Sequence, residues 1–181
     1  MVFKTQDGGN SWHVVSPDLT KNEKDKQGPG EKPYTNEAAG GENYNTLMSL
    51  VESPHEQGVL YAGSDDGLIH ITKDGGQNWT NITPKGITDG IINSIEVSPH
   101  NPATAYIVIM KYKSMDLKPY VFKTNNYGQS WTKIVNGFND PHGFVRVVRE
   151  DTKRKGLLYA GTETGLYISF NDGVNWQQFQ L

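Results

Sequence analysis

Residues 72–79 read TKDGGQNW, and the same spacing of Ser or Thr, Asp or Asn, Gly and Trp occurs three more times. The other copies are TQDGGNSW (5–12), TNNYGQSW (124–131) and SFNDGVNW (169–176), and the four copies contain all 4 tryptophans of the chain. A chance match is expected about once per fifty thousand windows, so this Trp box is a repeat. Successive copies begin 67, 52 and 45 residues apart, inside or near the range typical of propellers and solenoids.

Short apolar or alternating runs precede each of the last three boxes, and they indicate strands. Residues 46–83 contain four such runs separated by turn residues, as expected for antiparallel strands. Residues 91–135 and 144–181 repeat this plan, and no stretch has a convincing helical period. The strands expected in the first of these units are 46–52, 58–63, 67–72 and 79–83.

The repeats predict an all-β chain made of consecutive β-propeller blades. Residues 2–5 and 12–15 supply only the third and fourth strands of a blade, which gives about three and a half four-stranded antiparallel blades. Open ends of such a segment expose strand edges, so we expect the remaining blades of a longer parent, or self-association, to cover them. The expected single partial propeller, 1–181, consists of a half-blade (1–15), a long polar inter-blade loop (16–45) and blades at 46–83, 91–135 and 144–181.

The chemistry of the Trp box suits a hairpin between the third and fourth strands of a blade. Its Asp or Asn can accept backbone N–H bonds within the turn, helped by the Ser or Thr hydroxyl, and its Gly tolerates positive φ. We expect the Trp to fold back over its own hairpin. Two boxes carry Asn, which cannot act as a general base or carboxylate nucleophile, so the boxes are predicted to be structural. The structural box residues are Thr5, Asp7, Gly9, Trp12, Thr72, Asp74, Gly76, Trp79, Thr124, Asn126, Gly128, Trp131, Ser169, Asn171, Gly173 and Trp176.

The Trp box resembles the Asp-box, or bacterial neuraminidase repeat, of sialidases, sortilin-type receptors, xyloglucanases and photosystem assembly-factor propellers. The phrases GSDDGL (63–68), INSIEVSPH (92–100) and GLLYAGTETGLY (156–167) are similar to parts of large bacterial repeat proteins described as sortilin-like or glycosyl-hydrolase-like. The resemblance covers nearly the whole chain outside about 20–43. It implies Asp-box hairpins and a secreted or periplasmic location, although the chain opens on a repeat instead of a signal peptide. Such repeats occur in enzymes and binding proteins alike, so the resemblance is specific for fold and weak for function.

Composition excludes several classes of partner and site. The formal net charge is −3 and the sequence pI about 5.9, which does not provide the basic surface that binds nucleic acid. The chain has 0 cysteines, which excludes disulfides and thiolate metal sites. No apolar run approaches the roughly 18 residues of a membrane span. The 5 histidines show no metal-ligand spacing, and we expect neither a metal nor a cofactor.

Two enzymatic alternatives can be weighed against the sequence. Sialidase chemistry needs arginines from several blades, whereas here alternation would place Arg146 and Arg149 on opposite faces of one strand. Xyloglucanase-type hydrolysis needs two carboxylates about 5–10 Å apart across a cleft. Asp65, Asp66 and Glu163 occupy equivalent turns between second and third strands and are the candidates, although acidic residues beside glycine are also ordinary turn chemistry.

The loops between blades, and those between second and third strands, should form one face and are the better place for recognition. Tyr34, Tyr44 and Tyr112 in these loops could stack on a sugar ring or pack on a peptide. The ligand-face candidates retained are Asp65, Asp66, Tyr112 and Glu163. The loops expected on this face are 16–45, 64–66, 84–91, 112–118, 136–143 and 162–164.

The sequence therefore favours a non-catalytic binding or scaffold segment, whose parent recognises a peptide or a polysaccharide. By itself the chain is expected not to be an enzyme. The alternative is a fragment of a carbohydrate-active glycoside hydrolase of the xyloglucanase-like class. A purely structural segment that supports a site on other blades is the third interpretation.

Overall fold

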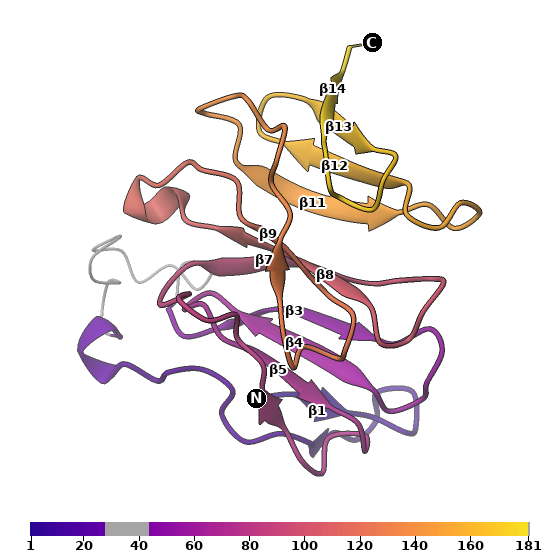
Figure 1. The fold of residues 1–181 in the computed structure, drawn as a ribbon. Helices are drawn as coiled ribbons and strands as arrows, with labels where there is room; N and C mark the ends of the chain where they lie inside the picture. The colour runs from indigo at the N-terminus through magenta and orange to yellow at the C-terminus, as the bar shows by residue number, and fades with distance from the viewer. Residues whose placement is uncertain (28–43, 181) are drawn as a thin grey trace.

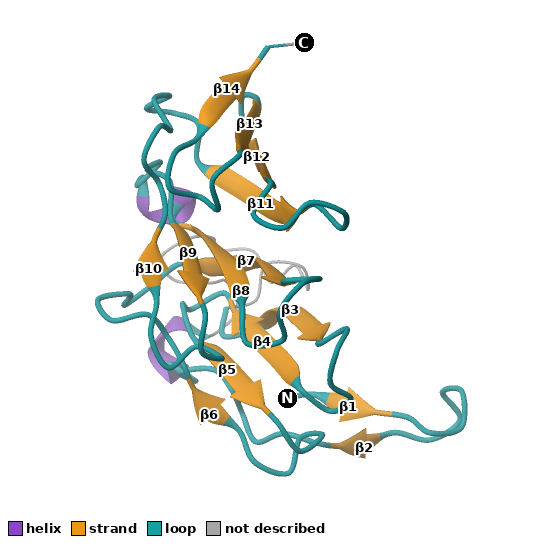
Figure 2. Cartoon of the chain, turned by 45° about the vertical axis from the view of Figure 1, so that its right-hand side comes forward, coloured by secondary structure: helices purple, strands orange, loops and turns teal. Residues whose placement is uncertain are grey.

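The computed structural model describes residues 1–27 and 44–180, whose regular structure is almost entirely β (Figure 1). The strands form one two-stranded and three four-stranded antiparallel sheets, and hydrogen-bonded neighbours in each sheet are consecutive in the chain. This confirms the prediction of an all-β segment of about three and a half blades. Figure 2 shows the sheets stacked in succession, with β1 and β2 at one end and β14 at the other. Part of the predicted loop 16–45, namely 28–43 with Tyr34, lies outside the described residues.

The four sheets are named here in chain order. The half-blade contains β1 (Phe3–Lys4) and β2 (His13–Val14). The first blade contains β3 (Leu47–Glu52), β4 (Leu60–Ser64), β5 (Ile69–Thr72) and β6 (Thr80–Asn81). The second blade contains β7 (Ile91–Val97), β8 (Ala105–Met110), β9 (Val121–Thr124) and β10 (Thr132–Lys133). The third blade contains β11 (Val145–Glu150), β12 (Leu158–Thr162), β13 (Leu166–Ser169) and β14 (Gln177–Phe179). The 3-10 turns are η1 (Lys24–Lys26) and η2 (Tyr112–Ser114).

The hydrophobic cores lie between blades. Every residue of β8 is buried, because the side chains of this strand alternate between two neighbouring sheets. Ile107 belongs to the cluster shared with the first blade, and Val108 belongs to the cluster shared with the third. The cluster between the half-blade and the first blade is smaller and has only Val2, Leu19 and Ala62 as its buried members among the described residues.

The outer strands are shorter than the sequence predicts. The sequence predicts a strand over 79–83, but the ladder with β5 includes only Thr80 and Asn81. Trp79 turns away from its own sheet, and Pro84, which lacks an N–H donor, follows soon after. Pairing with β5 continues for one residue beyond the strand, since the Ile82 N–H donates to the Ile69 carbonyl at 2.9 Å.

The hydrogen bonds expected within the Trp box are present in all four copies. The Ser or Thr hydroxyl accepts a bond from the N–H of the box glycine at 2.8–3.0 Å. Oδ1 of the Asp or Asn accepts a bond from the N–H of the residue before the tryptophan at 2.9 Å. Hydrogen bonds from Ser11 hold the pKa of Asp7 at about 2, and those from Asn78 do the same for Asp74.

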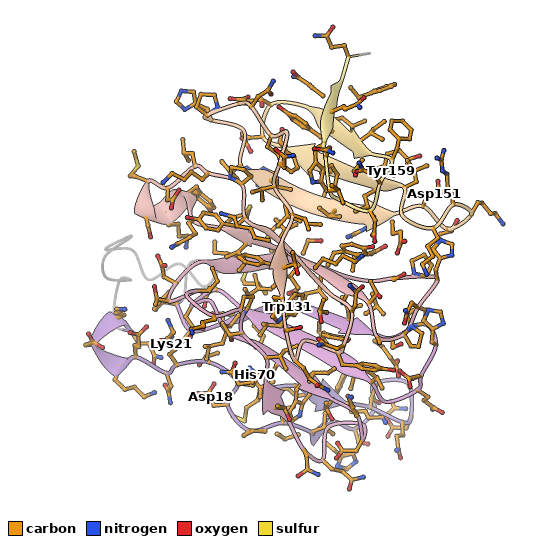
Figure 3. All side chains as sticks on the ribbon, in the orientation of Figure 1. Asp18, Lys21, His70, Trp131, Asp151 and Tyr159 are labelled. Carbon is orange, nitrogen blue, oxygen red and sulfur yellow. The ribbon has the colours of Figure 1, made fainter. Side chains whose placement is uncertain are left out.

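Three of the four tryptophans reach the preceding sheet, which corrects the expectation that each covers its own hairpin. Each indole N–H donates to a main-chain carbonyl at the end of the outer strand before it. Trp131, labelled in Figure 3, thereby ties the second blade to the first. The three bonds are Trp79 to Val15 (2.9 Å), Trp131 to Ile82 (2.6 Å) and Trp176 to Ile134 (2.9 Å).

Trp12 differs from the other three tryptophans because no described sheet precedes the half-blade. Its indole N–H donates to Gly9 of its own box at 3.2 Å, and 59% of the residue's surface is exposed. Trp176 in the equivalent position is only 3% exposed. The burial of a box tryptophan therefore depends on the neighbouring blade and not on its own hairpin.

Candidate ligand-binding face

The described parts of the loops assigned to the ligand face gather along one side of the molecule, where η1 and η2 both lie (left in Figure 1). Asp66 forms an isolated β-bridge with Gly90, in the loop that leads into the second blade. Asp89, which directly precedes Gly90, pairs with the ammonium of Lys111 at 2.6 Å and accepts a hydrogen bond from Ser114 at 3.2 Å. A continuous row of contacts thus joins the first blade to η2 of the second.

Asp66 is fully buried and holds the two described ends of the long inter-blade loop. Its Oδ2 accepts hydrogen bonds from the Lys21 backbone N–H at 2.8 Å and from the Asn45 amide at 2.6 Å. Its Oδ1 accepts a bond from the Ser64 hydroxyl. Lys21, labelled in Figure 3, also donates through its ammonium to the carbonyl of Thr88. Oδ2 of Asp66 thus anchors the loop, while Oδ1 is occupied by Ser64 of the same blade.

The fold changes the acidity of Asp65, another of the predicted candidates. Only 7% of the residue is exposed, and its Oδ1 accepts a hydrogen bond from the Thr46 backbone N–H at 2.8 Å. Burial raises the pKa of the Asp65 carboxyl to about 6, and the hydrogen bond from Thr46 opposes that rise. A carboxyl group with such a pKa can hold or release a proton near neutral pH.

The raised pKa of Asp65 predicts a specific pH dependence of stability. The folded protein retains this proton more tightly than the unfolded chain, whose carboxyl has a pKa of 3.8. The resulting stabilisation is complete below pH 3.8 and is lost as the pH rises through about 6. Asp65→Asn keeps an Oδ1 acceptor but cannot ionise, so the gain in stability of the variant over wild type should grow from about pH 4 to about pH 7.

Denaturant unfolding at a series of pH values measures this difference. The low pKa values of Asp7 and Asp74 act in the opposite direction, since their stabilisation is lost as the pH falls toward 2. Their effect on stability therefore falls in a more acidic pH range, and it is the same in wild type and in Asp65→Asn. A difference between Asp65→Asn and wild type that stays constant from about pH 4 to about pH 7 would contradict the assignment.

Tyr112 and Glu163, two of the predicted residues, are brought together by Phe144 and Arg146. The rings of Tyr112 and Phe144 stack with centroids 5.6 Å apart and planes 17° apart. The Arg146 guanidinium lies 5.1 Å from the Phe144 centroid and donates from Nε to Glu163. This hydrogen bond raises the pKa of Arg146, which stays charged. We call these four residues the Tyr112 platform.

The Tyr112 platform combines aromatic surface with charged groups that remain accessible. Tyr112 is 38% exposed, and the side chains of Arg146 and Glu163 are 48% and 43% exposed. Phe144 is buried beneath them and fixes the Tyr112 ring. An aromatic surface beside a few oriented polar groups is the usual composition of a small-ligand site. The platform could bind the apolar face of a sugar ring or an extended peptide, with Arg146 and Glu163 offering donors and acceptors.

Phe144 and Arg146 were not among the predicted ligand-face residues. The sequence relates Arg146 only to a sialidase-like arginine cluster, and it places 144 at the start of a strand. Strand pairing provides a signal that could have found them, because the start of a first strand lies opposite the end of the second. The Glu163 N–H donates to the Phe144 carbonyl at 3.1 Å across this pairing.

The carboxylates of this face do not form one cluster. Asp65 and Asp66 lie at the end of the first blade's second strand, whereas Glu163 belongs to the third blade and is paired with Arg146. The second blade stands between these sites in the chain of sheets. Tyr44, another tyrosine considered for stacking, is buried at 8% exposure and has the Lys26 ammonium 5.5 Å from its ring centroid. The Tyr112 platform is the more open of the two aromatic positions.

The histidines and acidic residues of the described chain do not make a metal site. Within residues 1–27 and 44–180, no group of three or more His, Cys, Asp or Glu side chains is placed to hold a metal ion. None of the described helices is long and apolar enough to cross a membrane. His55 and His100 contact the next blade, with Nε2 positioned 2.9 Å from the Ser98 carbonyl and 2.7 Å from that of Asp151.

Comparison with known proteins supports a propeller. No protein-family model matches the chain. The oligoxyloglucan-reducing end-specific xyloglucanase of Emericella nidulans is 23% identical over 107 residues, which are 58% of this chain and 13% of that protein. The crystal structure of an ancestral GH74 enzyme matches 99% of this chain and 21% of its own, with 20% identity and a TM-score of 0.70. YCF48 bound to D1 peptide matches 74% of this chain and 40% of its own, with 23% identity and a TM-score of 0.57.

These relatives share the architecture at low sequence identity. The chain spans 13% of the curated xyloglucanase and 21% of the ancestral GH74 enzyme. Their likeness agrees with the order of antiparallel four-stranded sheets along the chain. The chain is therefore a β-propeller segment of about three and a half blades.

Proposed function

We propose that the chain is a non-catalytic binding segment of a propeller and that it contacts its ligand through the Tyr112 platform. The observation that carries this proposal is the stacking of the exposed Tyr112 on the buried Phe144, beside the accessible pair Arg146 and Glu163. A ring held in place by a second ring loses little conformational freedom when a ligand packs on it. The ligand would be a polysaccharide or an extended peptide. One of the similar proteins is a xyloglucanase, and another is YCF48 bound to D1 peptide.

The state of the acidic residues favours binding over hydrolysis. Asp66 accepts hydrogen bonds from the inter-blade loop through Oδ2 and from Ser64 of β4 through Oδ1, and Glu163 is paired with Arg146. A glycoside hydrolase needs an acid and a second carboxylate on opposite sides of one bond. The carboxylate that acts on the acidity of Asp65 is Asp66 of the same turn, and it lies on the same side of any bond that Asp65 could reach. The Tyr112 platform can bind a ligand without either residue.

Binding of xyloglucan oligosaccharides and of a panel of extended peptides tests the proposal by calorimetry. Tyr112→Ala should weaken binding by about tenfold, the effect expected for a central aromatic contact. Phe170→Ala is the matched control, since Phe170 is 54% exposed on the Trp-box turn of the third blade. Equal affinity of wild type and Tyr112→Ala, or equal loss in both variants, would contradict the role of the platform.

Glycoside hydrolysis is the second candidate function, and the acidity of Asp65 favours it. A pKa of about 6 suits a general acid, and the xyloglucanase and GH74 likenesses point to the same substrate class. Release of new reducing ends from xyloglucan by wild type, abolished in Asp65→Asn, would establish this function and overturn the non-catalytic one.

The proposal includes the setting of the segment. We assign its Trp boxes to the Asp-box class, because the same side-chain hydrogen bonds occur in all four copies. A location outside the cytoplasm follows from the resemblance to secreted or periplasmic repeat proteins. Further blades of a parent propeller, or a second copy of this chain, would cover the two open ends. Light scattering distinguishes a monomer from a self-associated form.

A further inference from the structure

The half-blade has an unpaired inner edge. In each complete blade the strand that leads into the Trp box, such as β5, lies between the second and fourth strands of its sheet. The corresponding strand β1 pairs only with β2 within the described part of the chain. Its other edge offers backbone donors and acceptors that a further strand could satisfy.

The face of the first blade next to this edge is open where its counterparts are covered. Leu50 pairs with Ala62, just as Ile95 pairs with Ile107 and Val148 with Ala160. The exposed fraction of Leu50 is 49%, whereas Ile95 and Val148 have 4% and 1%. Those two residues pack in the clusters between complete blades. Leu50 therefore lacks the cover that the inner strands of a preceding sheet supply elsewhere.

A groove of about 260 Å³ lies beside Leu50, where the inner strands of a preceding sheet would cover the first blade. Phe3 and Lys4 of β1 form one wall, and Leu50, Glu52 and Leu60 of the first blade form the other. Phe3 is 53% exposed even though it lies on a strand. The groove thus joins an unpaired strand edge to an uncovered apolar face.

We propose that this groove binds an antiparallel β-hairpin, which pairs with β1 and completes the half-blade. The complete blades show what the hairpin should look like, because their first and second strands occupy the corresponding place beside the third strand. The register Leu60 to Thr72 and Tyr61 to Ile71 in the first blade places the second strand of the hairpin opposite Thr5 and Lys4. The occupant is then a pair of strands like 47–64. It carries a large apolar residue at the position that corresponds to Tyr61, because Tyr61 is 0% exposed in the first blade.

A folded second copy does not supply such a hairpin from its described residues. Its inner pairs β3–β4, β7–β8 and β11–β12 are already joined to their own third strands. The occupant is therefore a hairpin of another polypeptide segment that completes the blade by strand addition. The groove lies at the half-blade, away from the Tyr112 platform of the second and third blades, so either proposal can fail alone.

A fusion tests the hairpin site within one chain. When Thr5 is aligned with Thr72, Met1 corresponds to Leu68, so residues 46–67 joined directly to Met1 reproduce the connection of a complete blade. The chain has 0 cysteines, and Leu50→Cys therefore introduces a single thiol in the groove. We expect the fusion to slow thiol labelling of that residue by at least about tenfold, because the hairpin covers it.

Two controls make the result specific. Met115→Cys places the thiol at a residue that is 86% exposed in the loop after η2, and its labelling should be unchanged by the fusion. A fusion whose added hairpin carries Tyr61→Asp should lose most of the protection at Leu50→Cys. A monomeric fusion that labels Leu50→Cys as fast as the unfused chain would overturn the proposal. Concentration-dependent protection of the unfused chain would overturn it in favour of a second copy as occupant.

Discussion

Replacing Trp176 by alanine should lower the free energy of unfolding by about 3–5 kcal/mol, the usual cost of truncating a buried tryptophan. Trp176 is 3% exposed, its indole lies 5.0 Å from the Phe138 ring, and its N–H donates to the Ile134 carbonyl of the second blade. The substitution removes both contacts and leaves a cavity between the second and third blades. Guanidinium unfolding followed by circular dichroism measures the change without relying on tryptophan fluorescence.

Trp12→Ala is the matched control for that substitution. Trp12 occupies the same position in its box, yet it is 59% exposed and its indole N–H donates to Gly9 of that same box. Its replacement should change the free energy of unfolding by about 0.5 kcal/mol, as is usual for surface positions. Similar losses in the two variants would mean that the tryptophans stabilise their own hairpins, contrary to the coupling between blades described here.

Gly128→Ala should destabilise the protein by about 1–3 kcal/mol more than Gly9→Ala. Both glycines have positive φ, +81° at Gly128 and +96° at Gly9, so alanine meets backbone strain of the same kind at each. A Cβ at Gly128 would lie 2.5 Å from Cδ1 of Ile82 in the first blade. At Gly9 the nearest atom is 3.9 Å away and belongs to Trp12 of the same box.

Chemical unfolding of both alanine variants separates backbone strain from inter-blade crowding. The strain common to both should cost about 1 kcal/mol, and only the crowding at Ile82 should add to it. Ile82 packs in the cluster between the first and second blades, so it has little room to move. Equal losses at 9 and 128 would show that the box glycine is required for its φ angle alone.

The sequence predicted the order of strands because each repeat carries its own local signals. Turn residues and alternation in 46–83 depend on neighbouring residues, and the structure has four antiparallel strands there. The role of Trp131 could not be predicted in the same way. Its partner Ile82 lies 49 residues earlier, and only the packing of one sheet on another brings the two together.

The ligand face was predicted in part for the same reason. Tyr112 and Glu163 could be assigned to inter-strand loops from their positions, but the link between them depends on Phe144 and Arg146 in a third segment. The raised pKa of Asp65 could not be predicted either, because acidic residues beside glycine in 63–67 are also typical of an ordinary hairpin turn. Burial of that turn under the ends of the inter-blade loop raises the pKa of its carboxyl.

Hydrogen exchange of the chain with saturating xyloglucan oligosaccharide tests most directly whether the Tyr112 platform is a binding site that does not catalyse. We predict slower exchange of the amides at 112–118, 144–146 and 162–164, no such change in Tyr112→Ala, and no new reducing ends in the same sample. An extended peptide that gives the same footprint would support the platform with the other ligand class. Protection centred on Asp65 together with release of reducing ends would contradict the account.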